Sequence, residues 1–283
     1  MQSLYDVPAP AKLNLFLHIT GKRPDGYHLL QSAFMLIDWC DTLHFELQPG
    51  GRITREDLAD ELPEDDLSVR AARALQQACH CPLGVHIGVL KRIPAQAGMG
   101  GGSSDAATTL LALNRLWNLD LSRGELMTLA APLGADVPFF LCGSNAWVEG
   151  IGEQLTPLEG PLALPPQRFV VVKPEAGLPT SRIFSQMAAK DYSGNARISG
   201  FAADPFGFGR NDLQGIAEML CPELAQALDW LMAQGLHGRM TGSGSAVFAA
   251  ASHAAHLPAP PGVWQVKVCD NLLVHPLAGW ATE

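Results

Sequence analysis

The sequence predicts an α/β (α+β) protein of two domains, and three observations lead to this fold class. Strand-like and helix-like segments alternate along the chain, which is the pattern of mixed α/β architectures. The 283 residues are enough for two ordinary domains with a sizeable core. A proline-rich stretch, EGPLALPP, resembles a domain linker. We therefore expect an N-terminal domain over residues 1–160 and a C-terminal domain over residues 161–283.

The first predicted elements are two long strands joined by a turn. Residues 11–20, AKLNLFLHIT, place apolar side chains at every second position, with Lys12 and Asn14 between them on the other face. This period of two predicts a half-buried strand. Residues 21–28, GKRPDGYH, contain the proline and glycine that favour a turn. A second strand is predicted over residues 29–47.

The later elements follow from the same two periodicities. Helices show apolar residues at three- and four-residue spacing, and strands show apolar runs bounded by turn residues. We expect a helix in 61–79 with acids in its first turn, a strand in 84–94, an amphipathic helix begun by Ser103, Ser104 and Asp105, a helix in 122–134, a strand in 168–174, a helix in 223–236 ended by Gly235, and a hairpin in 238–251.

Composition limits the classes of partner. Acidic residues outnumber basic ones 28 to 19, for a net charge of -9, which argues against nucleic acid as a partner. The chain has no long apolar run, so no membrane partner is expected, and its start does not resemble a signal peptide. The six cysteines are scattered, which is typical of reduced, mostly buried thiols. We expect a cytoplasmic protein.

A glycine-rich run marks the chemistry. Residues 94–107, PAQAGMGGGSSDAA, lie between a predicted strand and a predicted helix. A slack linker is one explanation, but a linker would not sit between two elements with so little spare chain. The other explanation is a phosphate-binding loop, because a helix N-terminus presents unpaired amides and partial positive charge. Glycines let phosphates approach the backbone closely, and Ser103 and Ser104 add hydroxyl groups.

The run matches none of three familiar phosphate-binding patterns. The Walker pattern needs a lysine after the glycines, and none is present. The Rossmann pattern would need glycine where Ser103 stands. The protein-kinase loop would need HRD and DFG elsewhere, and both are missing. Composition and spacing alone therefore predict a nucleotide- or phosphate-binding loop of a further kind.

Three separated motifs resemble the GHMP kinase superfamily, in the same order along the chain. Beside the glycine run, they are residues 8–32, PAPAKLNLFLHITGKRPDGYHLLQS, residues 133–143, LGADVPFFLCG, and residues 238–249, GRMTGSGSAVFA. The resemblance covers nearly the whole chain. It implies the two-domain GHMP kinase fold, with an N-terminal ribosomal-S5-like β/α domain and a C-terminal ferredoxin-like α/β plait.

The resemblance also implies an activity. It implies that ATP is a co-substrate, accompanied by Mg²⁺, and that the γ-phosphoryl group passes to an alcohol. The version with three glycines, two serines and Asp-Ala-Ala implies the 2-hydroxyl of 4-diphosphocytidyl-2-C-methyl-D-erythritol, in non-mevalonate isoprenoid precursor biosynthesis. The ATP contacts implied by the glycine run are Pro94, Ala95, Gln96, Ala97, Gly98, Met99, Gly100, Gly101, Gly102, Ser103 and Ser104.

Two residues match the catalytic pair of the superfamily. Asp136 would accept the proton of the alcohol or orient it, and Lys12 would pair with Asp136 and offset charge on the transferring group. Each residue also has an ordinary explanation. Asp136 precedes a proline-containing segment and could be a helix cap or turn residue, and Lys12 could be a solvated residue on the polar face of its strand.

Further residues are implied for the cytidyl substrate. Tyr27 would stack on the base, with His28 on the edge of the base and Phe184 on its other face. The remaining implied contacts are Asn14, Thr180, Thr241, Gly242, Ser243 and Gly244. Without the resemblance, these residues could be an edge-strand Asn, a surface Tyr-His pair, a core aromatic and a bare glycine turn. Asp66 stands where the superfamily often has Asn, which puts its contact with adenine in doubt.

Two other functions compete with this one. The chain could be a GHMP kinase for another small alcohol, such as homoserine or mevalonate, although those substrates carry no base to stack. It could also be a nucleotide-binding sensor without activity, although it retains both Lys12 and Asp136. The sequence assigns no metal ligands and allows either a monomer or a homodimer.

Overall fold

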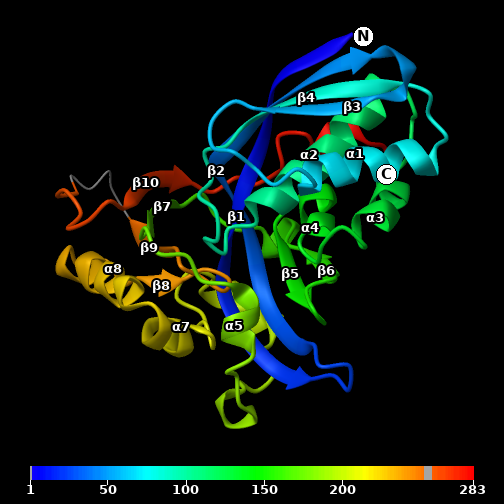
Figure 1. Cartoon of the computed structure of the whole chain (residues 1–283). Helices are drawn as coiled ribbons and strands as arrows, with labels where there is room; N and C mark the ends of the chain where they lie inside the picture. The colour runs from blue at the N-terminus through cyan, green and yellow to red at the C-terminus, as the bar shows by residue number, and fades with distance from the viewer. Residues whose placement is uncertain (1, 252–256) are drawn as a thin grey trace.

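The computed structural model describes residues 2–251 and 257–283. Two sheets and two groups of helices make up this part of the chain (Figure 1). The strands are β1 (Ser3–Lys22), β2 (His28–Gln48), β3 (Ile53–Asp57), β4 (Gly84–Leu90), β5 (Ala146–Glu149), β6 (Gln154–Pro157), β7 (Arg168–Lys173), β8 (Arg239–Met240), β9 (Val247–Ala251) and β10 (Gln265–Asp270). The helices are α1 (Leu67–Ala78), α2 (Gly101–Leu116), α3 (Arg123–Ala130), α4 (Val137–Cys142), α5 (Thr180–Phe184), α6 (Ile198–Ala203), α7 (Gln214–Leu220) and α8 (Pro222–Ala233).

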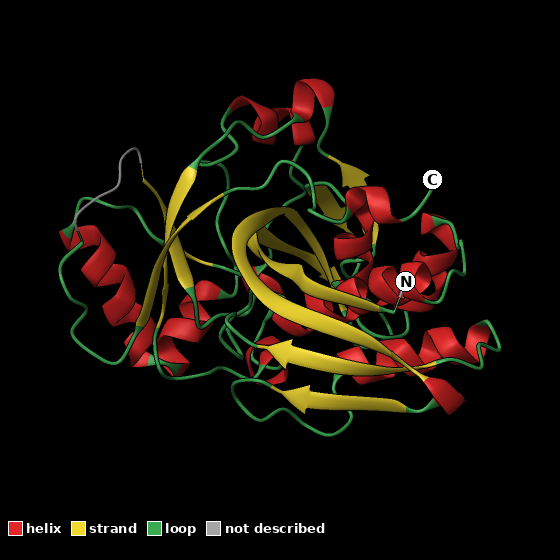
Figure 2. Ribbon diagram, turned by 90° about the horizontal axis from the view of Figure 1, so that it is seen from above, coloured by secondary structure: helices red, strands yellow, loops and turns green. Residues whose placement is uncertain are grey.

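The first sheet is built around the long hairpin of β1 and β2. Its strands lie in the order β3-β4-β2-β5-β6, and β1 pairs antiparallel with β2. The pairing of β3 with β4 is parallel, while the other pairs are antiparallel. Figure 2 shows how strongly the long strands of this sheet curve. The hairpin and its turn were predicted from the alternation and the Pro-Asp-Gly sequence, and both are confirmed.

The second sheet is antiparallel and has the order β10-β7-β9-β8. Helices α7 and α8 cover one of its faces, because Leu224 and Leu231 of α8 share a core with Val170 and Val172 of β7. The other face packs against the long hairpin, where Leu13 and other residues of β1 meet the second sheet. The order through the molecule is therefore helices, first sheet, second sheet, helices.

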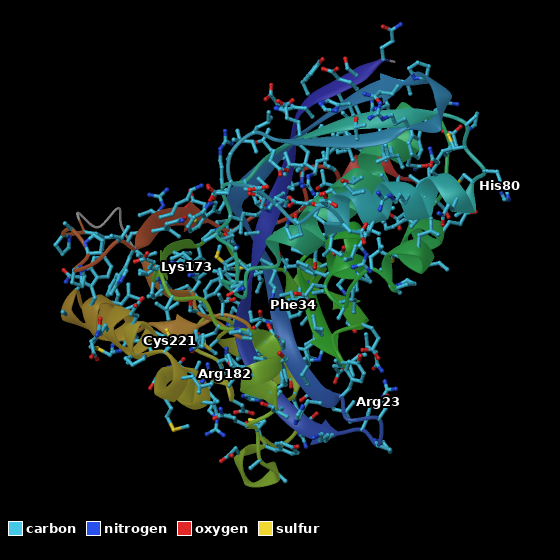
Figure 3. All side chains as sticks on the ribbon, viewed as in Figure 1. Arg23, Phe34, His80, Lys173, Arg182 and Cys221 are labelled. Carbon is cyan, nitrogen blue, oxygen red and sulfur yellow. The ribbon has the colours of Figure 1, made fainter. Side chains whose placement is uncertain are left out.

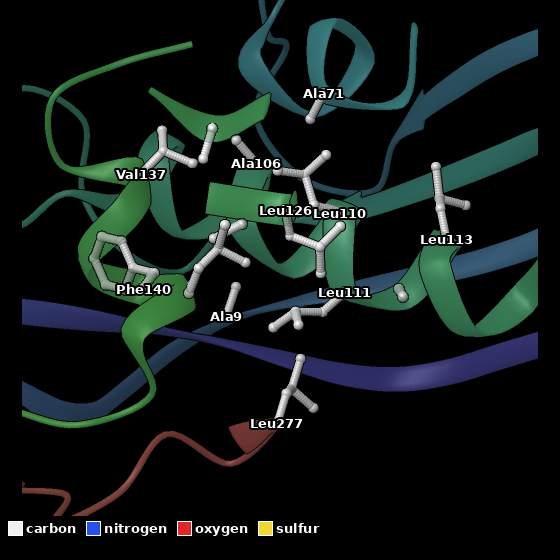
Figure 4. Close-up of a cluster of buried hydrophobic side chains, with 14 of the residues drawn as sticks. Ala9, Ala71, Ala106, Leu110, Leu111, Leu113, Leu126, Val137, Phe140 and Leu277 are labelled. Atoms are coloured by element: carbon white, nitrogen blue, oxygen red, sulfur yellow. The ribbon is translucent and has the colours of Figure 1, made fainter. Parts of the chain in front are cut away.

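Helix α2 lies at the centre of the first helical layer. Figure 4 shows Leu110, Leu111 and Leu113 of α2 packed among side chains of α1, α3 and α4. The sequence predicted an amphipathic helix, and this prediction is wrong in one respect. Residues from Ser104 to Asn114 are buried without interruption, because the sheet lies on one side of α2 and other helices lie on the remaining sides.

Three further local expectations need correction. Strand β1 is not half-buried, because Lys12, Asn14 and Phe16 on its supposed polar face are also buried. The glycine run, the loop after β8 and helix α6 cover this face. The expected acids are not in the first turn of α1, because the helix begins at Leu67 after an Asp66 cap. The six cysteines are free as expected, but only Cys221 and Cys269 are fully buried.

The end of the chain returns from the second sheet to the first. After β10, Asn271 bridges to Ile37 of β2 and Val274 bridges to Ser144, and Leu277 joins the core around α2. A domain boundary near residue 160 stays a prediction. Within residues 2–251 and 257–283, none of the helices combines the length and the apolar character that crossing a membrane requires.

Candidate active site

A cavity of about 980 Å³ opens between the glycine run, the hairpin, helix α5 and the loop after β8. Its volume is at the upper end of what small-molecule sites usually show. Most of the residues predicted from the sequence line this one cavity, although they come from distant parts of the chain. They are Lys12, Asn14, Tyr27, His28, residues 94–103, Asp136, Thr180, Phe184, Gly242, Ser243 and Gly244.

The two glycine motifs pack directly against each other. Gly98 has a φ of +71°, and a Cβ atom there would overlap the carbonyl oxygen of Thr241 and lie 2.9 Å from the amide nitrogen of Gly244. Two backbone hydrogen bonds join the motifs, from Ser245 N to Gln96 O (3.1 Å) and from Ala246 N to Ala97 O (3.3 Å). The glycines are therefore required by close backbone contact as well as by φ.

The glycine run ends in the N-terminus of α2. Gly100, with a φ of +72°, occupies the N-cap position, and no side chain caps the helix. The first backbone hydrogen bond of the helix runs from Ser104 N to Gly100 O (2.9 Å). Helix geometry leaves the amides of Gly101, Gly102 and Ser103 without intrahelical partners, and all three residues line the cavity. This is the arrangement that binds anions.

Lys12 and Asp136 meet beside this helix start. The Lys12 Nζ atom lies 3.5 Å from Asp136 Oδ2, donates a hydrogen bond to Asn14 Oδ1, and lies 4.6 Å from the centre of the Phe34 ring. Figure 3 shows Phe34 near the centre of the molecule. Burial lowers the pKa of Lys12, and the charge of Asp136 only partly opposes this shift.

The backbone around Asp136 explains how its carboxylate reaches the cavity. Val137 N bonds to Gly134 O (3.1 Å) in a turn, and Pro138 lies in the first turn of α4, where its missing amide costs nothing. Asp136 occupies the N-cap position but makes no capping hydrogen bond. The ordinary explanation, a capping aspartate, therefore does not describe its side chain, which is 30% exposed and directed to Lys12.

The opposite end of the cavity is aromatic. The ring of His28 lies 5.4 Å from that of Phe184 at an interplanar angle of 36°, and Tyr27 beside them is 62% exposed. Burial, with a smaller contribution from Lys22, lowers the pKa of His28, which favours the neutral imidazole. Below the rings, Thr180 Oγ1 and Ser243 Oγ are 2.7 Å apart. This end offers flat apolar surfaces together with hydroxyl groups.

Two of the predicted residues lie behind the wall of the cavity. The Ser104 side chain is fully buried and lies away from the cavity. Thr241 accepts a hydrogen bond from Asn14 N (2.9 Å) at its Oγ1, so it supports the site from behind. Neither residue lines the cavity, so direct contacts of Ser104 and Thr241 with a ligand stay predictions. The alternative interpretation of Lys12, as a solvated residue on its strand, is wrong because Lys12 is buried.

Sequence reasoning missed several lining residues. Lys91, directly after β4, and Asp105, in α2, line the cavity and are joined by an ion pair of 2.5 Å. Asp66 also lines it, but it caps α1 through Val69 N (3.1 Å) and pairs with Arg55 (2.9 Å). The position of Lys91 immediately before the glycine run was the available signal.

Comparison with known proteins identifies the same family that the sequence motifs resemble. The family "GHMP kinases N terminal domain" matches residues 66–144, and "GHMP kinases C terminal" matches residues 184–258. The chain is 68% identical to the 4-diphosphocytidyl-2-C-methyl-D-erythritol kinase of Acidovorax sp. (strain JS42), over 99% of both proteins. It is 66% identical to the kinase of the same name from Delftia acidovorans, over 100% of this chain and 99% of that protein.

Solved structures extend the comparison. A crystal structure of 4-(cytidine 5'-diphospho)-2C-methyl-D-erythritol kinase is 35% identical, with a TM-score of 0.78, over 94% of this chain and 98% of the other. A homoserine kinase from Cytophaga hutchinsonii has a TM-score of 0.70 over 97% and 96% of the two chains, but at 15% identity it shows the fold alone.

The chain therefore belongs to the GHMP kinases: it is a small-molecule kinase with ATP as its co-substrate, and its fold is the one that the motifs implied. Within this superfamily, it belongs to the family of the 4-diphosphocytidyl-2-C-methyl-D-erythritol kinases. Membership of this kinase family also excludes the sensor alternative.

Proposed function

We propose that this protein transfers the γ-phosphoryl group of ATP to the 2-hydroxyl of 4-diphosphocytidyl-2-C-methyl-D-erythritol, a step of non-mevalonate isoprenoid precursor biosynthesis. The observation that carries the proposal is the pairing of Lys12 with Asp136 (3.5 Å) in the same cavity as the open N-terminus of α2. The names and identities of the relatives support the substrate.

The reaction needs positioning and charge more than covalent chemistry. The phosphates of ATP bind the amides of residues 101–103, which points the γ-phosphorus toward Lys12. Asp136 accepts the proton of the 2-hydroxyl as the oxygen bonds to the γ-phosphorus. The bond from that phosphorus to the β,γ-bridging oxygen breaks, and ADP leaves. Lys12 offsets the negative charge on the transferring group, an effect that burial strengthens.

The aromatic end of the cavity supports a substrate that carries a base. Tyr27 and Phe184 provide two rings for stacking, and His28, 5.4 Å from Phe184, provides a hydrogen-bonding edge. The hydroxyls of Thr180, at the start of α5, and Ser243, in the glycine turn, bind the diphosphate of the substrate. Homoserine and mevalonate have no group that would use these rings.

Mg²⁺ is part of the proposal because the cavity lining cannot neutralise a triphosphate by itself. Lys12 and Lys91 are opposed in the lining by Asp66, Asp105 and Asp136. Each of these carboxylates already has a partner: Asp66 pairs with Arg55, Asp105 with Lys91 and Asp136 with Lys12. Among the described residues, no cluster of three or more His, Cys, Asp and Glu forms a metal site, which fits an ion held mainly by ATP phosphates. Bound there, Mg²⁺ would offset phosphate charge.

A coupled assay of ADP release with a panel of alcohols tests the function. We expect ADP release with 4-diphosphocytidyl-2-C-methyl-D-erythritol and none with methylerythritol phosphate, homoserine or mevalonate. Release with homoserine or mevalonate alone would establish the competing kinase function. Release with none of them would contradict the proposal.

Location and assembly complete the proposal. We place the protein in the cytoplasm, as a monomer or homodimer, with no nucleic-acid partner. Its six free thiols and its net charge of -9 support this placement. Light scattering after size-exclusion chromatography measures the oligomeric state directly.

A further inference from the structure

A buried ion cluster lies beside the phosphate-binding loop and takes no part in the proposed reaction. Lys91 Nζ donates hydrogen bonds to Asp41 and, at 2.5 Å, to Asp105. The exposed fractions of the three side chains are 13% for Lys91, 0% for Asp41 and 3% for Asp105. Charged groups this deeply buried are costly unless they are paired and hydrogen-bonded, as these three are to one another.

The three residues come from three different segments around the loop. Asp41 belongs to β2, Lys91 follows β4 directly, and Asp105 lies in the second turn of α2. Asp41 Oδ1 also accepts hydrogen bonds from the amides of Arg92 (2.5 Å) and Ile93 (2.8 Å). The cluster therefore fixes both flanks of residues 94–100, the chain that enters the loop and the helix that leaves it.

The cluster also lies next to the amides that face the cavity. A Cβ atom on Gly101, the first residue of α2, would lie 3.4 Å from Lys91 Nζ. Lys91 and Asp105 themselves line the cavity, and within the described residues Asp105 Oδ1 is buried without a hydrogen-bond partner. A shift of this cluster would move the first turn of α2 and its free amides.

We propose that Asp41, Lys91 and Asp105 are positioning residues for ATP: together they hold the two flanks of the glycine loop so that the amides of residues 101–103 converge on the triphosphate. This inference rests on the proposed function, which places the phosphates there. Asp41 offsets the charge of Lys91 and both aspartates hydrogen-bond to it, so its ammonium fixes geometry rather than attracting the nucleotide.

The charge state of the cluster gives a second readout. Burial raises the pKa of Asp105 to about 8; Lys91 opposes the shift and Asp41 adds to it. Below this pH the cluster holds an extra proton and is close to neutral. Above it, Asp105 carries a negative charge in the N-terminal part of α2, where the phosphates bind. Lys91 and Asp41 are the charged groups that act on Asp105, and Lys12, across the loop, is paired with Asp136.

Three variants test the proposal in the full-length enzyme. Asp105→Leu keeps the volume but breaks the link to Lys91, and we expect it to raise the KM for ATP about ten- to hundredfold. It should leave the KM for the cytidyl substrate within about twofold, because that subsite does not depend on this flank. Lys91→Met should act in the same direction, with lower thermal stability. Asp105→Asn keeps the hydrogen bond and should stay close to the wild type at pH 7.

The pH profile and a matched control separate positioning from general structure. The wild type should lose affinity for a nonhydrolysable ATP analogue above pH 8, and Asp105→Asn should not. Asp212→Leu, which removes a buried carboxylate paired with the exposed Arg210 away from the cavity, should lower stability without changing the ratio of the two KM values. Equal changes in both KM values for Asp105→Leu, or a change in stability alone, would overturn the inference. Inactivity of the wild type toward the cytidyl substrate would instead overturn the proposed function.

Discussion

Lys12 and Lys91 are both buried lysines on the wall of one cavity, yet their surroundings differ. Lys12 faces one carboxylate at 3.5 Å, and burial lowers its pKa. Burial acts on Lys91 in the same direction, but Asp105 and Asp41 outweigh it, so the pKa of Lys91 is raised. The number and distance of the carboxylates, rather than burial itself, decide what each lysine can do.

The difference separates reacting groups from positioning groups. A lysine whose charge is only partly compensated gains by meeting a phosphoryl group, because that group supplies the missing negative charge. A lysine held between two carboxylates gains no further electrostatic stabilisation from an additional anion, so it holds the neighbouring segments in place. Changes around Lys12 should therefore alter turnover, while changes around Lys91 should alter ATP binding.

The largest effect is expected from Asp136→Asn, on the Lys12 side. This change removes the proton acceptor and a charge but keeps the shape, so kcat should fall about 10²–10⁴-fold. The affinity for an ATP analogue, measured by calorimetry, should be nearly unchanged. Asp60→Asn, at an exposed aspartate outside the cavity, is the control. Near wild-type turnover in Asp136→Asn would show that another group accepts the proton.

Lys12→Met should come next, with a loss in kcat of about 10²–10³-fold from missing charge stabilisation. Burial of the Lys12 ammonium costs desolvation free energy that Asp136 only partly offsets. The variant avoids this cost, so its melting temperature should stay the same or rise. Lys91→Met should lower the melting temperature. If calorimetric scans showed the two variants melting alike, the contrast between the lysines would be lost.

Gly98→Ala tests the glycine loop that the Lys91 cluster holds. Its Cβ would overlap Thr241 O at a positive φ, so the two glycine motifs must separate. We expect a loss of about 1–3 kcal/mol in stability together with a raised KM for ATP. Gly124→Ala in α3, where a Cβ meets nothing within 4 Å, should be neutral or stabilising. Equal melting temperatures for the two variants would contradict this account of the loop.

Tyr27→Ala should have the smallest effect and acts on neither lysine. Loss of one stacking surface of about 1–3 kcal/mol corresponds to a rise of about 5- to 150-fold in the KM for the cytidyl substrate. The KM for ATP should not change. Tyr5→Ala, at a similarly exposed tyrosine outside the cavity, should change neither constant. Equal changes in both constants for Tyr27→Ala would show that Tyr27 does not contact the base.

Local features of this fold could be predicted from the sequence. The hairpin, the helix at the glycine run and the open N-terminus of α2 follow from periodicity and backbone geometry, and the structure contains all three. The two-domain architecture and the pairing of Lys12 with Asp136 came from the resemblance, because no periodicity reports contacts between distant segments.

Other features depend on which segments meet in the folded chain. The burial of Lys12 arises because the glycine run, Phe34 and Asp136 enclose it on a face of β1 that alternates like a solvated one. The link of Asp41 to Lys91 and Asp105 was missed for the same reason. Each of the three residues, considered alone, is an ordinary residue at a strand, a strand end or a helix start.

A crystal structure with a nonhydrolysable ATP analogue and 4-diphosphocytidyl-2-C-methyl-D-erythritol bound together tests the central claim most directly. We predict the γ-phosphate on the amides of residues 101–103, next to Lys12, with the 2-hydroxyl about 2.6–3.2 Å from the Asp136 carboxylate. A triphosphate bound away from α2, or a 2-hydroxyl out of reach of Asp136, would contradict it.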